Sequence, residues 1–246
     1  MREQIIQTVE QEKIVVIVRG VEREKLIPLA EAMYQGGIRL LEITYSANGK
    51  VSDEETAANI AALAKHFEGR MYIGAGTVLT EKQVELTAKA GGKFIISPDT
   101  CPEVIQKTRE LGLVSMPGAL TPSEMQIAHR NGADFVKLFP AGGMGSGYVK
   151  AILAPLNHVR LVAVGGVSEK NACEFIRAGC VAVGVGGVDF NAVMGDEPLG
   201  TFGKITLSVV DKQQLELVIT ATVCNCSHFI IKSGQNCLLI IARNYN

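Results

Sequence analysis

The sequence predicts an α/β protein built as a (β/α)8 TIM barrel, followed by a C-terminal segment of a different kind. Short apolar runs rich in β-branched residues alternate with segments of helical spacing between residues 10 and 193. This alternation is typical of a parallel sheet that is covered on both faces. The chain has 246 residues, a length that such barrels commonly use as one domain.

Eight strands can be counted, and eight repeated units favour a closed barrel. A doubly wound open sheet is the competing fold, but no G-x-G-x-x-G motif follows the first strand, so we rank it behind the barrel. The strands are expected to begin near Ile14, Ile38, Met71, Lys93, Leu113, Asp134, Arg160 and Val181.

Helices are expected between the strands, and both of their ends carry signals. Leu26 to Tyr34 has helical spacing, and glycine is the residue that most easily ends a helix in the left-handed backbone conformation. Glycines in that place are Gly36-Gly37, Gly91, Gly112, Gly132 and Gly179, and four helix starts are expected at Ser52-Asp53, Thr80-Glu81, Thr121-Pro122 and Ser168-Glu169.

The C-terminal segment departs from this pattern. A last helix is expected after Val193, but residues 205–241 alternate and are rich in Val, Ile, Thr and Cys, as in strands and hairpins. We therefore predict two parts: a barrel of residues 1–195, and an atypical β-rich appendage of residues 196–246 in place of the last helix.

Composition excludes several classes of protein. The net charge is −1 with no basic stretch, which argues against a nucleic-acid partner. Residues 1–11 carry several charges and do not look like a signal peptide, and no apolar run reaches the roughly 18 residues of a membrane span. We expect a cytoplasmic protein with no membrane partner. The six cysteines and four histidines lack metal-site spacing, so free thiols and no metal are expected.

Catalytic groups in such barrels lie at the C-terminal ends of the strands. Lys137 stands there between Val136 and Leu138, and desolvation of a buried amine lowers its pKa and makes it a nucleophile. The alternative is a lysine at a strand end whose ammonium reaches water. Glu42 and Arg19 end two other strands and are expected to share the space with Lys137. Glu42 is then a candidate acid/base, or else half of a structural ion pair with Lys137 or Arg19.

Glycines follow the last two strands, at Gly165-Gly166 and at Gly186-Gly187. Barrels often bind phosphate there through backbone N–H groups and a helix N-terminus, which residues 168–171 are expected to open.

Seven segments together resemble the 2-keto-3-deoxy-6-phosphogluconate / 2-keto-4-hydroxyglutarate aldolase family. They occur one per strand end in the family's order, and the resemblance covers roughly residues 10 to 193. The segments are Ile17-Val18-Arg19-Gly20, Leu41-Glu42-Ile43-Thr44, Gly74-Ala75-Gly76-Thr77-Val78-Leu79, Ile96-Ser97-Pro98, Met116-Pro117-Gly118, Val136-Lys137-Leu138-Phe139-Pro140-Ala141 and Val164-Gly165-Gly166-Val167.

The resemblance implies a class I aldolase with no cofactor, usually a homotrimer. It cleaves a 2-keto-3-deoxy-6-phospho sugar acid or 4-hydroxy-2-oxoglutarate to pyruvate and an aldehyde, which is glyceraldehyde 3-phosphate or glyoxylate. Lys137 forms a Schiff base with the 2-keto group, and Glu42 shuttles protons. The resemblance assigns Thr77, Pro98 and Phe139 to the pyruvate pocket, Gly165 and Gly166 to the phosphate loop, and Arg19 to the substrate carboxylate.

Three positions depart from the family pattern. Ser46 stands where some members carry an arginine for the substrate carboxylate, and Gly187 stands where many carry a phosphate-binding serine. Val164 replaces a threonine associated with C4 stereochemistry. The choice among phosphogluconate, phosphogalactonate and hydroxyglutarate therefore stays open.

Two other functions remain open. One is a phosphate-binding barrel that works without an imine. The other is a catalytically degenerate barrel that binds a metabolite, with the C-terminal segment as an interaction module.

Overall fold

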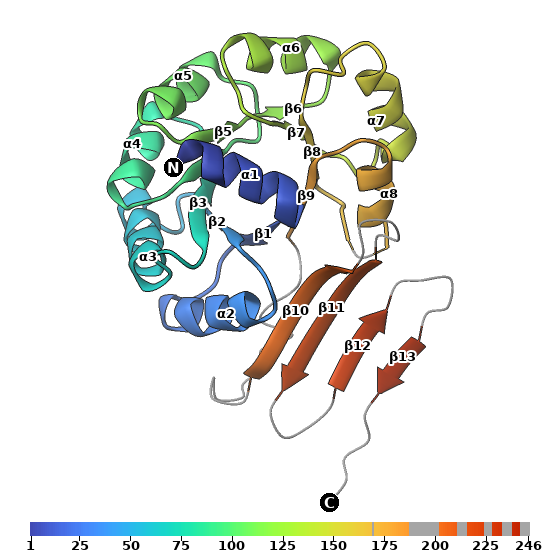
Figure 1. Cartoon of the computed structure of the whole chain (residues 1–246). Helices are drawn as coiled ribbons and strands as arrows, with labels where there is room; N and C mark the ends of the chain where they lie inside the picture. The colour runs from blue at the N-terminus through green and yellow to red at the C-terminus, as the bar shows by residue number, and fades with distance from the viewer. Residues whose placement is uncertain (169, 187–201, 211–215, 224–227, 233–237, 242–246) are drawn as a thin grey trace, which may run out of the picture.

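The computed structural model describes residues 1–168, 170–186, 202–210, 216–223, 228–232 and 238–241 (Figure 1). The predicted domain boundary at residue 195 and the helix expected after Val193 lie outside these residues. The elements up to residue 130 are α1 (Arg2–Glu12), β1 (Ile14–Val18), α2 (Arg23–Gln35), β2 (Leu40–Thr44), α3 (Asp53–His66), β3 (Tyr72–Gly76), α4 (Glu81–Lys89), β4 (Phe94–Ile96), α5 (Pro102–Glu110), β5 (Val114–Met116), β6 (Gly118–Ala119) and α6 (Pro122–Arg130). They are followed by β7 (Val136–Leu138), α7 (Gly145–Leu153), β8 (Leu161–Val164), α8 (Ala172–Arg177), β9 (Ala182–Val185), β10 (Phe202–Val210), β11 (Glu216–Val223), β12 (His228–Lys232) and β13 (Leu238–Ile241).

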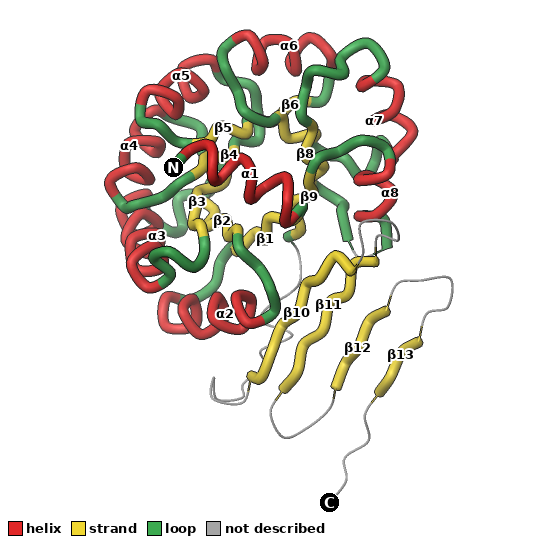
Figure 2. The backbone as a smooth tube through the Cα atoms, viewed as in Figure 1, coloured by secondary structure: helices red, strands yellow, loops and turns green. Residues whose placement is uncertain are grey.

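The first nine strands form one parallel sheet that curls into a barrel inside a ring of helices (Figure 2). Its order is β5-β4-β3-β2-β1-β9-β8-β7-β6, and β1 pairs with both β2 and β9. The first strand thus pairs with the last, and β5 and β6 form the two ends of the order, so the nine strands make a nearly closed barrel. This confirms the predicted fold class. The competing prediction, an open doubly wound sheet, is therefore wrong.

The fifth predicted strand is divided into β5 and β6, one on each side of Pro117. Proline has no backbone N–H, so it cannot continue a ladder of hydrogen bonds. The two strands stand at the two ends of the sheet order, and the chain itself joins them. All eight predicted strand positions therefore fall on the ring.

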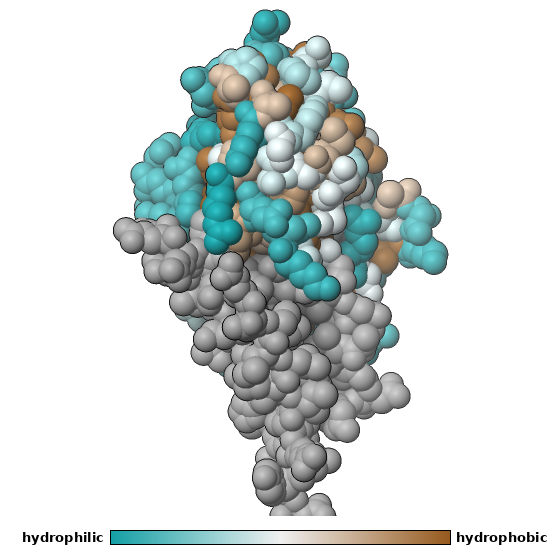
Figure 3. Space-filling view, turned by 90° about the vertical axis from the view of Figure 1, so that its right-hand side faces the viewer, coloured by the Kyte–Doolittle hydropathy of each residue, from teal (hydrophilic) through white to brown (hydrophobic). Residues whose placement is uncertain are grey.

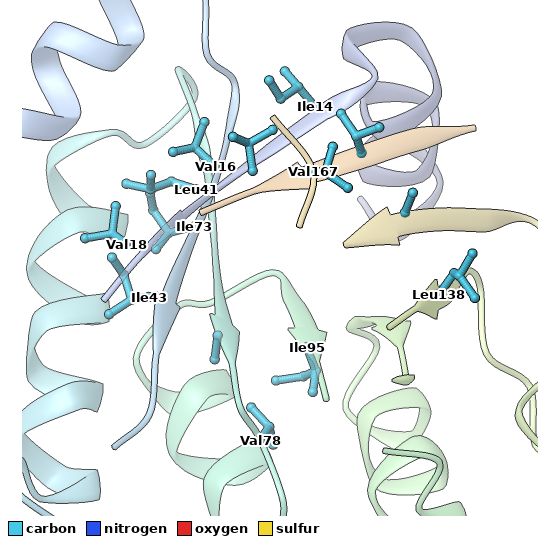
Figure 4. Close-up of a cluster of buried hydrophobic side chains, with 14 of the residues drawn as sticks. Ile14, Val16, Val18, Leu41, Ile43, Ile73, Val78, Ile95, Leu138 and Val167 are labelled. Atoms are coloured by element: carbon cyan, nitrogen blue, oxygen red, sulfur yellow. The ribbon is translucent and has the colours of Figure 1, made fainter. Parts of the chain in front are cut away.

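Side chains alternate between two buried clusters. In β1, Ile14, Val16 and Val18 belong to the outer cluster beneath the helices (Figure 4), whereas Val15 belongs to the inner cluster. The same alternation holds in β2, where Leu41 packs outward. Successive strand residues point to opposite faces, so the parity of a residue fixes whether it points into the barrel.

Helix α1 covers one mouth of the barrel and was not predicted. Its Ile5, Ile6 and Val9 are buried in the inner cluster. An ion pair joins Arg2 of α1 to Asp134, which also accepts a hydrogen bond from the Ser115 N–H at 3.0 Å. Because α1 precedes β1, it lies at the N-terminal ends of the strands and leaves the opposite mouth for the site.

The expected helix ends are largely as predicted. Ser52, Thr80 and Thr121 cap α3, α4 and α6 with their side-chain oxygens, and Thr121 and Glu124 form a capping box. The glycines at five helix ends take positive φ angles: Gly37, Gly91, Gly112, Gly132 and Gly179. The exception is the helix expected at Ser168. There α8 begins at Ala172 with Asn171 as its N-cap.

The C-terminal segment contains strands, as predicted. Strands β10 to β13 form a separate antiparallel sheet in chain order. Strand β10 contacts α2, and β11 contacts α8. No helix follows β9 in the described part of the C-terminal segment. The barrel face seen in Figure 3 mixes hydrophilic and hydrophobic residues.

Two further findings concern the described residues alone. None of their helices is long and apolar enough to cross a membrane. Cys101, Cys173 and Cys180 are free thiols, and burial raises the pKa of Cys180 to about 12.

Candidate active site

Lys137 and Glu42 point into the barrel interior. Their strand neighbours Val136, Leu138, Leu41 and Ile43 all belong to the outer cluster, so the residues between them face inward. Both side chains are buried, with Glu42 2% and Lys137 7% exposed. The structure therefore brings the two predicted groups into one space at the mouth opposite α1.

Glu42 sits in an environment that favours its neutral form. Burial raises the pKa of its carboxyl group, while the charges of Lys137 and Arg19 and the Thr44 hydrogen bond act in the opposite direction. The Thr44 hydroxyl donates to Glu42 Oε1 at 3.3 Å, and Oε2 has no partner among the described residues. A Cβ on Gly76 would collide with Oε1, so a glycine at this point of β3 makes room for the carboxylate.

Lys137 sits in an environment that favours the free amine. Burial lowers its pKa, the Glu42 carboxylate raises it, and the Arg19 charge lowers it. Its Nζ lies 4.6 Å from the centre of the Phe139 ring. The charges of Lys137 and Glu42 attract each other, although no ion pair within 4 Å joins the two side chains.

Arg19 and Thr77 close one side of the site. Arg19 follows β1 directly, and its guanidinium donates to Thr77 Oγ1 at 3.4 Å. Thr77 follows β3 and has a φ of 54°, which is uncommon outside glycine. The charge of Arg19 lowers the pKa of both Lys137 and Glu42, so Arg19 lies near both groups, as the sequence predicted.

Pro98 and Phe139 occupy the ends of two other strands. Pro98 follows β4, and its carbonyl oxygen would collide with a Cβ on Gly118. Phe139 follows β7 and is 37% exposed, so the phenyl ring borders the opening rather than the core. Both residues thus lie at the mouth where the sequence placed them.

The loop after β8 offers free backbone donors. Gly165 and Gly166 have φ angles of 83° and 74°, and a Cβ on either would crowd Phe139 or Gly142. The Asn171 side chain donates to Gly166 O at 2.8 Å and fixes the loop. Neither glycine N–H has an acceptor among the described residues, which is the condition for binding an anion.

Of the two predicted glycines after β9, the structure describes Gly186. Gly186 packs against Ile17, where a Cβ would lie 2.8 Å from the Ile17 Cβ. Gly187 lies outside the described residues. The helix expected to open at residues 168–171 begins at Ala172 and has six residues, and residue 169 is not described. Within the described residues, the candidate N–H donors for an anion are therefore those of the glycine loop after β8.

A second cavity, which the sequence did not reveal, lies beside this site. It has a volume of about 650 Å³ and borders the loops after β1 and β2. Its one signal in the sequence is the long polar segment between Ser46 and Ser52, which contains Asn48, Gly49 and Lys50.

No group of three or more His, Cys, Asp or Glu side chains is placed to hold a metal ion in the described part of the chain. What the site does contain is a buried amine, a buried carboxyl group, a guanidinium and a loop of free N–H groups at one mouth of a parallel barrel. The fold and these features place the chain in the class of parallel (β/α) barrels with titratable groups buried at one mouth.

Comparison with known proteins gives the family. A model of the KDPG and KHG aldolase family matches residues 5–196. A probable 2-dehydro-3-deoxy-6-phosphogalactonate aldolase of Rhizobium meliloti (strain 1021) is 36% identical over 174 residues, which are 70% of this chain and 79% of the relative. The 2-dehydro-3-deoxy-6-phosphogalactonate aldolase of Escherichia coli (strain K12) is 31% identical over 174 residues, which are 70% of this chain and 82% of that protein.

A solved structure shows the same fold. The KDPG aldolase of Legionella pneumophila, with pyruvate captured at low pH as a covalent carbinolamine intermediate, matches this chain with a TM-score of 0.68. It is 28% identical, and the match covers 77% of this chain and 90% of that one. The chain belongs to the KDPG and KHG aldolase family. The predicted family and the aldehyde-lyase class that the family represents are confirmed.

Proposed function

We propose that this protein is a class I aldolase that cleaves a 4-hydroxy-2-keto acid to pyruvate and an aldehyde. The observation that carries the proposal is the buried pair of Lys137 and Glu42, each shifted toward its neutral form and facing the barrel interior. A neutral amine is nucleophilic, and a carboxyl group with a raised pKa exchanges protons near neutral pH.

The chemistry begins at Lys137. Its Nζ attacks the C2 carbonyl carbon of the substrate and forms a carbinolamine. The Glu42 carboxyl group gives a proton to the carbinolamine hydroxyl, which leaves as water, so that an iminium ion and the Glu42 carboxylate remain. Glu42 takes the proton of the C4 hydroxyl as the C3–C4 bond breaks. The bonding electrons move into the iminium, which leaves an enamine of pyruvate and frees the aldehyde. Protonation at C3 and hydrolysis then release pyruvate and restore the amine.

The other groups bind the substrate. Arg19 meets the C1 carboxylate, because a guanidinium suits a carboxylate and Ser46 carries no charge. Thr77, Pro98 and Phe139 line the pyruvate end, and the free N–H groups of Gly165 and Gly166 bind a terminal phosphate. The captured carbinolamine of the Legionella pneumophila relative supports a covalent step of this kind.

The substrate to test first is 2-keto-3-deoxy-6-phosphogalactonate. Both curated relatives described above act on it by name, and Val164 presents an apolar side chain to the barrel interior at the end of β8. Phosphogluconate and hydroxyglutarate substrates are the alternatives. We further propose a homotrimer, which sedimentation of the full chain tests.

The decisive assay measures pyruvate release from a panel of 4-hydroxy-2-keto acids. The panel contains the galactonate and gluconate epimers, each with and without the 6-phosphate, and 4-hydroxy-2-oxoglutarate. We expect the highest kcat/KM for the phosphorylated galactonate epimer. Release from the gluconate epimer at an equal rate would contradict the stereochemical assignment, and no release from any member would favour a degenerate metabolite-binding barrel.

One substitution separates the proposal from a phosphate-binding barrel without imine chemistry. A guanidinium stays protonated and cannot form an imine, so Lys137→Arg is expected to abolish turnover. Substantial residual activity in this variant would favour the other enzyme. Lys150→Arg, on the exposed surface of α7, is the matched control and should keep full activity.

A further inference from the structure

The buried carboxyl group of Glu42 has a single hydrogen-bond donor among the described residues. The Thr44 hydroxyl donates to its Oε1 at 3.3 Å, and Oε2 has no partner there. The nearby cations, Lys137 and Arg19, act on the carboxyl group through their charges. Because a hydrogen bond has a preferred direction and a charge at a distance has none, Thr44 is the group that determines how the carboxyl group is turned.

Thr44 reaches the carboxyl group because both residues stand on the inward face of β2. They are two positions apart, and such residues of a strand point to the same side. Ile43 between them belongs to the outer cluster. Thr44 is the last residue of β2 and is half-buried, so it lies between Glu42 and the open mouth. Its branched side chain is stiff about χ1, which keeps the hydroxyl in place.

Strand β3 confines the carboxyl group from the other side. Gly76 lies beside Thr44 in the parallel register of the two strands. A Cβ on Gly76 would overlap Oε1, so this oxygen rests against bare backbone. The space beside Gly74, the preceding inward position of β3, is filled by the ring of Phe94. The carboxyl group therefore lies between the Thr44 hydroxyl and the β3 backbone, which limits its rotation.

We propose that Thr44 is a positioning residue for the proton transfers of Glu42. Its hydroxyl holds Oε1 against β3 and keeps the carboxyl group in one orientation toward the reacting carbons of the substrate. The inference rests on the proposed aldol cleavage, in which Glu42 gives a proton to the carbinolamine hydroxyl and later takes that of the C4 hydroxyl. Thr44 itself makes no bond to the substrate.

Loss of the hydroxyl should have two effects. The hydrogen bond from Thr44 lowers the pKa of Glu42 against the larger, raising effect of burial. Without this donor the carboxylate is less stable, so the pKa of Glu42 should rise further. The second effect concerns orientation, because a misplaced reacting group slows the chemical step even when the substrate still binds.

Thr44→Val tests the role by replacing the hydroxyl with a methyl group at nearly the same shape. We expect kcat on the pH plateau to fall about 10-fold, the lower end of the effect of losing a hydrogen bond to a charged group. KM should stay unchanged, and the acid limb of kcat should move to higher pH. Thr44→Ser keeps the hydroxyl and should restore both the plateau and the limb.

Thr8→Val is the matched control. Thr8 is also half-buried, and it lies on α1 at the opposite mouth, where its hydroxyl donates to the Gln4 carbonyl at 2.8 Å. The control loses the same hydroxyl and should keep kcat, KM and the pH profile. Valine suits a strand, so Thr44→Val is expected to fold. Thr44→Ala removes the same hydroxyl and replaces this variant if it does not fold.

A titration that needs no turnover measures the hydrogen bond directly. The full chain is labelled with ¹³C at the carboxyl carbon of its glutamate side chains, and the Glu42 signal is assigned by its loss in Glu42→Gln. We expect the midpoint of this signal to lie at higher pH in Thr44→Val than in the wild type. Thr8→Val should leave the midpoint in place.

Three results would overturn the role of Thr44 in an active enzyme. The first is a kcat and pH profile of Thr44→Val equal to those of Thr8→Val. The second is a Glu42 midpoint that does not rise in Thr44→Val. The third is an equal loss of kcat in Thr44→Ser, which would assign the effect to the lost methyl group. A wild-type chain that releases no pyruvate would instead overturn the proposed function, and the role of Thr44 with it.

Discussion

Lys137 is buried among apolar strands, an environment that disfavours the charged form of its side chain. Burial lowers its pKa below that of an ordinary lysine, so between the two pKa values the unfolded chain binds a proton that the folded chain lacks. The free energy of unfolding therefore rises with pH through this window. Below this pH window the folded protein carries a buried ammonium group, which lowers its free energy of unfolding.

This cost gives the first prediction. Lys137→Met removes the charge at nearly the same shape, so the variant should be inactive but more stable at neutral pH. A gain of about 1 kcal/mol corresponds to a rise in Tm of about 2–4 °C for a protein of this size. The gain should shrink as pH rises toward the pKa of an ordinary lysine. Thermal unfolding at several pH values measures it, and a variant that is less stable at every pH would contradict the account.

Glu42 gives the second prediction. Glu42→Gln keeps the shape but cannot accept a proton, and loss of an acid/base group typically lowers kcat about 10²–10⁴-fold. Because burial raises the pKa of Glu42 and the base form takes the C4 proton, wild-type kcat should fall as pH drops through that raised pKa. The variant should lose this acid limb. Glu85→Gln, on the surface of α4, should keep both the rate and the pH profile.

Single residues also show what sequence can and cannot predict. Lys137, Glu42 and Arg19 were placed together because each ends a strand, and strand ends of a parallel barrel meet at one mouth. The cavity beside the site was not found, since it depends on how α2 and α3 lie against the loops after β1 and β2. No local pattern records such a distance between elements.

At the scale of elements, the sequence predicted helix ends correctly where a single residue determines the backbone conformation. Glycine after a helix and Thr121 before one act within a turn, and the structure confirms both. The start of α8 was placed three residues early: the N-cap position is Asn171 and not Ser168, and no side chain caps this helix. Helix α1 was not predicted, because its few apolar residues, Ile5, Ile6 and Val9, are buried only through contact with the barrel mouth.

The glycine loop after β8 gives the third prediction. Gly166→Ala adds a Cβ at a φ of 74° against Gly142 and should displace the free N–H groups. Losing one charge-assisted hydrogen bond corresponds to an increase in KM of about 10–100-fold. This increase should appear for phosphorylated substrates and not for 4-hydroxy-2-oxoglutarate.

Gly112→Ala is the matched control for that loop. It has a similar φ of 70°, but a Cβ there meets nothing within 4 Å. It should therefore carry the same backbone strain and leave every KM unchanged. An equal increase in KM for the unphosphorylated substrate in Gly166→Ala would remove the phosphate assignment.

At the scale of the whole molecule, α1 ties the start of the chain to the barrel. The carboxylate of Asp134 is buried, whereas the Arg2 side chain that pairs with it is 32% exposed. Removing one partner of a fully buried pair costs about 3–5 kcal/mol, and the exposure of Arg2 reduces that figure. Helix α1 is therefore expected to contribute to global stability without touching the site.

The fourth prediction tests this separation of stability from activity. Arg2→Gln should lower the free energy of unfolding by about 1–2 kcal/mol in a urea titration and leave KM unchanged. Lys82→Gln breaks an ion pair between two mostly exposed side chains, Lys82 and Glu54, and should have no measurable effect. Equal effects of the two substitutions would show that α1 is held by its apolar face alone.

The central claim is that Lys137 is the amine that bonds to the substrate. Incubation of the full chain with pyruvate and borohydride reduces an imine to a stable secondary amine, and peptide mass mapping locates the added mass. The account predicts one adduct per chain, on Lys137, and none in Lys137→Met. The absence of an adduct, or an adduct on another lysine, would contradict it.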